Sequence, residues 1–128
     1  MKIRWTKDSI RVRITPSELD AIESGEGIKD AFMVHGMPFW TVVVTQSHYS
    51  SLTFNKENAA VLIKLGREDK DTLLDPTAEG VYLQDAATDI RYYIEKDFPC
   101  AHPRAIESSE PVTETFEPPA GFLERKMD

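Results

Sequence analysis

The chain of 128 residues holds a single cysteine, Cys100, so it forms no internal disulfide and fits a reducing compartment. It also lacks long apolar runs. The longest, Trp40 to Val44, includes a threonine and is far shorter than the ~20 residues that span a bilayer. The opening residues, Met1 to Trp5, contain no continuous apolar stretch of the kind that forms a secretory signal. These absences predict a cytoplasmic protein that does not associate with membranes.

Positive charge is scarce as well, with 15 Lys and Arg against 22 Asp and Glu and a net charge of −7. The resulting pI of about 5.0 argues against a general binder of nucleic acid or anionic membranes, because such proteins present excess positive charge. Hydrophobic residues make up 41% of the chain and aromatic residues 9%, which is enough for one packed core. We therefore expect one folded domain that does not bind nucleic acid.

Motifs that mark catalytic or cofactor sites are missing too. The chain has no Gly-rich phosphate loop, no H-E-x-x-H, no G-x-S-x-G and no paired C-x-x-C. Cys100 and His102, with Asp97 nearby, are of types that ligate metals or form nucleophile pairs, but a structural zinc takes four ligands and no orienting acid is specified. We expect no metal site, no cofactor and no catalytic residue, with Cys100 packing as a small apolar residue.

What the chain does contain is one strand and helix pattern that occurs twice. The stretch Val12-Arg13-Ile14, residues 15–26 and Gly27-Ile28 corresponds to Ile63-Lys64-Leu65, residues 66–79 and Gly80-Val81. In both copies a basic residue stands between apolar strand residues, a short acidic helical stretch follows, and a Glu-Gly turn opens the next strand. The pattern predicts an α+β domain of about eight mostly antiparallel strands in a curved or barrel-like sheet, with two short helices and duplicated strand-strand-helix-strand-strand halves.

Individual elements follow from local signals. Residues 2–6 and 10–14 alternate between apolar and polar side chains, which predicts a hairpin with one buried face. Thr15 and Glu18 form a capping box around Pro16 and so predict a helix start. Further strands are expected near residues 28–34, 39–45, 52–54, 59–65, 80–83 and 89–95, with a second helix at 67–74. The side chains predicted to be buried are Ile3, Trp5, Ile10, Val12, Ile14, Val42, Val44, Ile63, Leu65, Ile90, Tyr92 and Ile94.

The composition changes near Arg104. Residues 105–128 hold six acidic residues against two basic ones, and Pro111, Pro118 and Pro119 interrupt any regular element. We therefore assign residues 1–104 to the single α+β domain and residues 105–128 to an acidic, Pro-rich tail that is disordered or draped over it.

The most promising binding surface is the basic face of the first hairpin, together with the last strand if the two are neighbours. Like charges opposite one another on paired strands are unfavourable, so this face needs a counter-charge. The counter-charge comes either from two carboxylates of the last strand, which we favour, or from a bound anion or acidic partner, which Arg would grip with its forked guanidinium. The basic residues are Lys2, Arg4, Arg11, Arg13 and Arg91, and the two carboxylates are Glu95 and Asp97.

Two segments carry a resemblance to a known family. KIRWTKDSIRVRITPSEL at residues 2–19 and DIRYYIEKDFPC at residues 89–100 resemble the most recognisable segments of a family of small bacterial proteins known only as a domain of unknown function. Its members open with a basic hairpin that runs into a T-x-[ST]-E helix, and they end the fold with [IV]-E-K-D-F-x-C. The resemblance implies a small bacterial α+β domain that ends near Arg104, and it implies no activity.

The repeated layout is also similar to that of the CYTH-like triphosphatase barrels. That family binds triphosphate through inward basic residues and metal through an N-terminal E-x-E-x-K. This chain has Lys2-Ile3-Arg4-Trp5-Thr6 at the corresponding place, so the metal-binding glutamates are absent. The likeness therefore implies topology alone.

Three hypotheses about function remain open. The first, which we favour because no catalytic constellation is visible, is a non-enzymatic binding or interaction module for an unknown protein or a small anionic ligand. The second is an anion- or phosphate-binding enzyme with a CYTH-like barrel pocket. The third is an accessory subunit of a larger assembly. The sequence does not indicate an oligomeric state.

Overall fold

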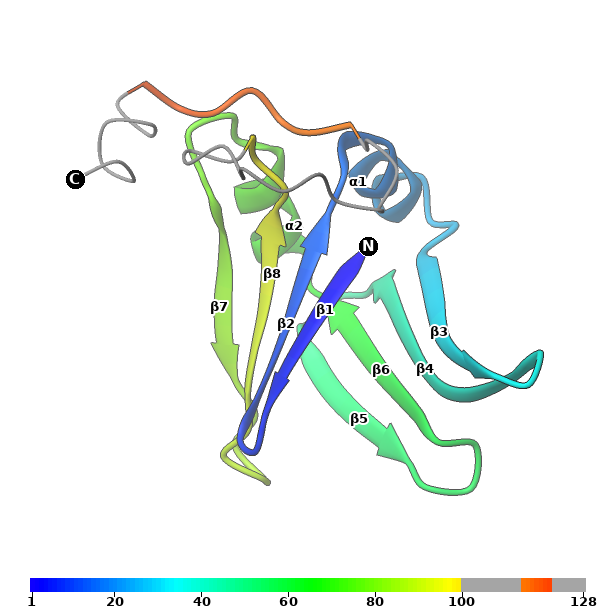
Figure 1. The fold of residues 1–128 in the computed structure, drawn as a ribbon. Coiled ribbons are helices and arrows are strands. Elements are labelled where there is room, and N and C mark those ends of the chain that lie inside the picture. Colours follow the sequence, from blue (N-terminus) through cyan, green and yellow to red (C-terminus); the bar gives the residue numbers. More distant parts are fainter. Residues whose placement is uncertain (100–113, 121–128) are drawn as a thin grey trace.

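The computed structural model describes residues 1–99 and 114–120, and these form eight strands and two helices (Figure 1). In chain order the elements are β1 (Lys2–Thr6), β2 (Ser9–Ile14), α1 (Pro16–Glu23), β3 (Ile28–Val34), β4 (Met37–Gln46), β5 (Ser51–Asn55), β6 (Ala60–Leu65), α2 (Arg67–Leu74), β7 (Gly80–Gln84) and β8 (Arg91–Lys96). The predicted α+β class, the number of strands and the two short helices are confirmed.

The strands form two separate four-stranded sheets. The first sheet has the order β1-β2-β8-β7 and the second the order β3-β4-β6-β5. Each sheet joins two antiparallel hairpins through one central parallel pair, β2 with β8 and β4 with β6. The two helices lie at one end of the sheets, which diverge towards the other end (Figure 1). The prediction of one curved or barrel-like sheet is wrong, because the strands divide between two sheets that do not close on each other.

The strand orders of the two sheets are related. Exchanging β1, β2, β3 and β4 with β5, β6, β7 and β8 converts the order of one sheet into that of the other. The chain thus has two halves, β1 to β4 and β5 to β8. The first hairpin of each half pairs with the second hairpin of the other half. This is a relation of topology, and the predicted superposition of residues 10–45 on residues 61–95 stays a prediction.

The two helices begin in different ways. Thr15 accepts a hydrogen bond from the Glu18 amide at 3.3 Å, and the Glu18 carboxylate accepts one from the Thr15 amide at 3.0 Å, which confirms the predicted capping box of α1. Helix α2 follows Gly66 and has no side-chain cap. The Gly66 amide instead donates to Ser50 Oγ at 2.8 Å, and a Cβ at Gly66 would lie 2.7 Å from the Ser50 nitrogen. Only glycine permits this close approach to the preceding loop.

The core lies between the two sheets and beneath both helices. Nine of the twelve side chains predicted to be buried are buried, while Ile3 and Ile90 are half-buried. The prediction is wrong for Trp5, which is 42% exposed because it lies on the edge strand β1, where the centroid of its ring lies 5.1 Å from that of Trp40 in the second sheet. The core side chains are Ile10, Val12, Ile14, Leu19, Ile22, Val42, Val44, Leu52, Val61, Ile63, Leu65, Leu73, Val81, Tyr92 and Ile94.

A short segment of the predicted tail contacts the domain. The Phe116 amide donates to the Asp97 carbonyl at 2.8 Å, and the Phe116 ring lies edge-on to Phe98 with centroids 6.3 Å apart. Glu114 accepts hydrogen bonds from Ser17 at the first turn of α1. Cys100, His102 and Pro111 lie outside the described residues. Among the helices of the described part, none has the length and apolar character needed to cross a bilayer.

Candidate functional site

The outer face of the first sheet brings the predicted basic residues together in two rows. One row runs Arg4, Arg11, Tyr93 and Tyr82 across β1, β2, β8 and β7. The next row runs Lys2, Arg13, Glu95 and Gly80 across the same strands. These side chains face away from the core because strand residues alternate, and Ile10, Val12 and Ile14 occupy the inner face of β2.

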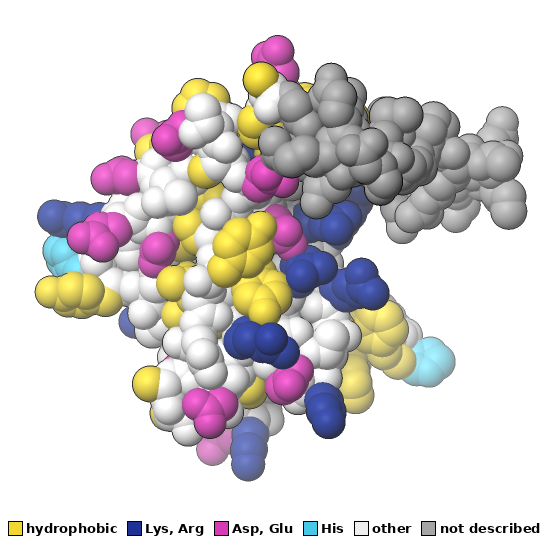
Figure 2. Space-filling model, turned by 90° about the vertical axis from the view of Figure 1, so that its left-hand side faces the viewer, with side chains coloured by type: hydrophobic (Ala, Val, Ile, Leu, Met, Phe, Trp, Pro, Cys, Tyr) yellow, Lys and Arg dark blue, Asp and Glu magenta, His cyan; other side chains and the backbone are white. Residues whose placement is uncertain are grey.

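A shallow hollow lies on this face over the first hairpin. It has a volume of about 120 Å³, and we call it the basic hollow; its lining residues are Lys2, Ile3, Arg4, Arg11 and Arg13. Figure 2 shows Lys and Arg side chains gathered on this side of the molecule. Arg91, also predicted for the site, does not line the hollow. It lies opposite Ser9 and pairs with the exposed Asp8 at 3.5 Å.

Arg11 is held in place from several sides. Its Nε lies 2.6 Å from Oε1 of Glu95, so the two side chains form an ion pair. Both atoms are buried, and neither makes a hydrogen bond. The guanidinium also lies over the Tyr93 ring, 5.3 Å from the centroid, as in a cation–π contact. The other Glu95 oxygen accepts a hydrogen bond from the Tyr82 hydroxyl at 3.2 Å. Arg11 is therefore already neutralised and oriented by its own chain.

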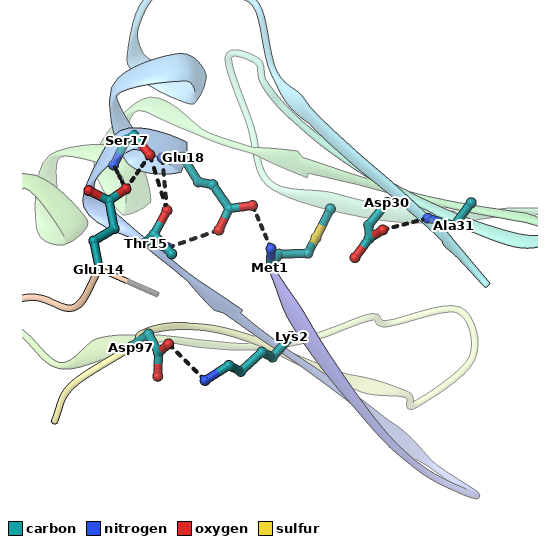
Figure 3. Close-up of polar contacts among 9 residues, drawn as sticks. All are labelled: Met1, Lys2, Thr15, Ser17, Glu18, Asp30, Ala31, Asp97 and Glu114. Atoms are coloured by element: carbon teal, nitrogen blue, oxygen red, sulfur yellow. Dashed lines mark hydrogen bonds and ion pairs between the residues drawn. The ribbon is translucent and has the colours of Figure 1, made fainter. Parts of the chain in front are cut away.

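Lys2 is paired at the other end of the hollow. Its Nζ lies 3.1 Å from Oδ2 of Asp97, as Figure 3 shows. Asp97 is buried, and its amide donates to the Ile14 carbonyl at 2.9 Å, which anchors it just beyond the end of β8. The two carboxylates predicted as counter-charges thus each lie against one basic residue of the hairpin.

Arg4 and Arg13 differ from their neighbours. Within the described residues neither side chain makes a hydrogen bond, an ion pair or a ring contact, and both residues are exposed. The four basic residues of the hollow face two paired carboxylates, so the hollow carries a net charge of 4 − 2 = +2. This local excess lies on a chain whose total charge is −7.

The environment shifts the protonation of Tyr82. Burial, followed by the nearby Glu95 carboxylate, raises the pKa of Tyr82 to about 12. Both effects disfavour the phenolate, so the hydroxyl stays protonated and remains a donor to Glu95 at neutral pH.

On the inner side of the same sheet, burial lowers the pKa of Lys96, and Asp75 partly offsets this effect. The Lys96 ammonium donates to the Asp75 carbonyl at 2.7 Å, and it lies 5.5 Å from the centroid of the Phe116 ring. Lys96 therefore belongs to the packing under the segment 114–120 and not to the basic hollow.

The two tyrosines beside the hollow were not predicted as part of the site. Neither Tyr82 nor Tyr93 was among the residues that the sequence indicated for this face. The alternation of β7 and β8 places both outward, and their antiparallel register sets them opposite each other with rings 5.4 Å apart. Elsewhere, no three His, Cys, Asp or Glu side chains of the described part converge as metal ligands.

One family model matches residues 1–119, and its description is a family of unknown function, DUF7009. The match passes Arg104, so the expectation that the family ends near that residue is wrong. The docked segment 114–119 lies within the matched region. No curated protein matches the chain. No solved structure matches it either.

Proposed function

We infer that this chain, which belongs to the family of unknown function DUF7009, is a non-enzymatic binding module that holds an anionic group in the basic hollow. The observation that carries this proposal is the pair Arg4 and Arg13, which have no partner among the described residues and line a hollow of net charge +2. Arginine suits this role because its fork grips carboxylate or phosphate with two parallel hydrogen bonds.

The size of the hollow limits the ligand. Sites for drug-sized molecules enclose about 300–1,000 Å³, whereas the basic hollow measures about 120 Å³. It accommodates a single phosphate or carboxylate group, so the rest of the ligand lies on the open face beside Tyr82 and Tyr93. This geometry suits an acidic or phosphorylated group carried by a larger partner, and an accessory subunit would bind its assembly in the same way.

The enzyme alternative has less support. It required an anion pocket inside a closed barrel, whereas the two sheets stay separate and the space between them is filled by the apolar core. The residues that line the basic hollow are cationic or apolar, and none of them is a carboxylate, histidine or hydroxyl that could act as base or nucleophile.

The shared topology supports a second part of the proposal, that the two halves are structural repeats. Residues 10–45 and 61–95 both run strand, helix, strand and strand, and in both the last two strands form an antiparallel hairpin. Superposition of the two segments tests this relation. A poor fit of α1 on α2 when the strands are overlaid would contradict it.

Anion binding is tested by thermal stabilisation with inorganic phosphate, sulfate and citrate at low and high salt. We expect saturable stabilisation of the wild type that weakens with added NaCl, because a ligand that binds only the folded state raises stability and salt screens the charges. The stabilisation should be lost in Arg4→Gln/Arg13→Gln and kept in the matched control Arg91→Gln, which changes a basic residue of the same sheet outside the hollow. Equal loss in both variants, or a wild type that no anion stabilises, would refute the proposal.

A further inference from the structure

The hairpin of β3 and β4 ends in an exposed apolar tip, which we define as residues Phe32–Phe39. Four of its large side chains are more than half exposed: Phe32 by 66%, Met33 by 52%, Met37 by 70% and Phe39 by 68%. Between them, His35 and Gly36 have positive φ angles of 52° and 77°, as in a two-residue hairpin turn. The tight turn and the ladder of β3 with β4 hold these side chains on a preformed surface, and Figure 1 shows the hairpin at the diverging end of the sheets.

The same part of the chain is free of charge. Residues 31–55 contain no Lys, Arg, Asp or Glu, although 29% of the whole chain is charged. This matters for contact between two identical copies, because a two-fold interface brings the same patch of both copies together, so an excess of charge on the patch would face the same excess on its partner. Elsewhere the surface of a chain with net charge −7 repels a second copy, but the apolar tip does not.

The exposed area suits a small dimer interface. At roughly 200 Å² for a fully exposed large side chain, the tip presents on the order of 500 Å² of apolar surface, near the upper end for a single patch on a monomer. Two such patches bury roughly 1,000 Å² when they meet, which is the lower bound for a specific interface.

The backbone of β3 offers a second means of contact. Strand β3 is an edge of the second sheet, so one row of its amides and carbonyls is unpaired within that sheet. Proteins usually protect such edges with charged side chains. The edge strand β1 follows this rule with Lys2 and Arg4, whereas Ala31–Val34 of β3 carries no charge. A two-fold axis normal to the sheet would set β3 antiparallel to its copy and join the two sheets into one.

We propose that the β3–β4 hairpin is a self-association surface through which two copies of this chain form a two-fold dimer, with β3 against β3 and the apolar tips in contact. The proposal rests on the uncharged tip and the free edge, and it is independent of the basic hollow, which lies on the other sheet.

The proposed dimer is tested by size-exclusion chromatography with light scattering. The full chain is loaded over a range of concentrations. The wild type should show twice the chain mass of 14.5 kDa, and its dissociation should not increase with salt, because the apolar tip contains no Lys, Arg, Asp or Glu. Met37→Glu/Phe39→Glu should return the mass to that of one chain. The matched control Tyr49→Glu, at a side chain 85% exposed outside the hairpin, should remain a dimer. Met37→Ser/Phe39→Ser keeps the test valid if the charged variant fails to fold, and circular dichroism verifies the fold of each variant.

A wild type that stays monomeric at every concentration would overturn the proposal, as would a folded tip variant that remains dimeric. Dissociation of the Tyr49→Glu control would also overturn it, because the contact would then not depend on the tip. A monomeric wild type that co-sediments with phosphatidylcholine–phosphatidylglycerol vesicles, and loses this in Met37→Glu/Phe39→Glu, would assign the hairpin to a bilayer surface instead.

Discussion

Glu95 lies directly opposite Arg13 in the register of β2 and β8, yet its carboxylate contacts Arg11, two residues away on the same strand. Tyr82 explains this choice, because its hydroxyl holds the second oxygen of Glu95 from the β7 side. The diagonal pairing neutralises Arg11 and leaves Arg13 without a partner among the described residues. The positive charge available for a ligand is therefore set by a contact between three strands.

The Arg11–Glu95 contact should contribute measurably to stability. In a double-mutant cycle with Arg11→Met and Glu95→Gln, we expect a coupling free energy of about 1 kcal/mol, because both side chains are partly shielded from solvent. The exposed Asp8–Arg91 pair of the same sheet is the control, and its coupling should be near zero. Urea unfolding of the single and double variants measures both values. Equal coupling in the two cycles would show that shielding of Arg11 has no effect.

Tyr82 should lose its phenolic proton at a higher pH than an ordinary tyrosine. Its pKa is raised to about 12 by burial and then by Glu95, so the wild type should show a tyrosinate absorbance change near that pH that is missing in Tyr82→Phe. Glu95→Gln should move the change to lower pH, because it removes the neighbouring negative charge. If Tyr82→Phe left the high-pH absorbance change intact, the assignment would be wrong.

The same shift has a consequence for stability. A tyrosine whose pKa is higher in the folded state than in the unfolded chain adds stability that is complete below the unfolded value of ~10. That stability is lost as the pH rises from there through the folded value of about 12. Between these limits the wild type should lose more free energy of unfolding than Tyr82→Phe does, and chemical denaturation at a series of pH values measures the difference.

The capping box of α1 should be worth about 1 kcal/mol, since Thr15→Ala removes the acceptor for the Glu18 amide. Thr72→Ala in α2 is a matched control, because its hydroxyl bonds a carbonyl inside the helix and caps nothing. The free energy of unfolding of Thr72→Ala should differ from that of the wild type by less than about 0.5 kcal/mol. A similar loss in both variants would mean that the effect reflects threonine in general and not the cap.

Phe116 should stabilise the domain from outside its main core. We expect Phe116→Ala to lower the free energy of unfolding by about 1 kcal/mol, through loss of its contacts with Phe98 and Lys96, and to lower the melting temperature by several degrees. A chain that ends at residue 107 should still unfold cooperatively, with a midpoint close to that of Phe116→Ala. Loss of cooperative unfolding in the shortened chain would show that the segment is required for folding.

Local sequence signals determined much of the architecture. The alternation of Ile10, Val12 and Ile14 with basic residues specified which face of β2 is buried, because a strand turns each successive side chain to the opposite side. The capping box at Thr15 located the start of α1, because its partners are three residues apart. Such signals depend on contacts between near neighbours in the chain, and they can therefore be recognised without knowledge of the fold.

The choice of strand partners was decided only by the tertiary structure. Parallel pairing of β2 with β8 joins residues far apart in the chain, and many pairings satisfy the same alternation equally well. That pairing divides the strands into two sheets, leaves Trp5 on an exposed edge, and brings Tyr82, Glu95 and Arg11 together. The basic residues could be read from the chain, but which of them are neutralised depends on long-range packing of both sheets around one core.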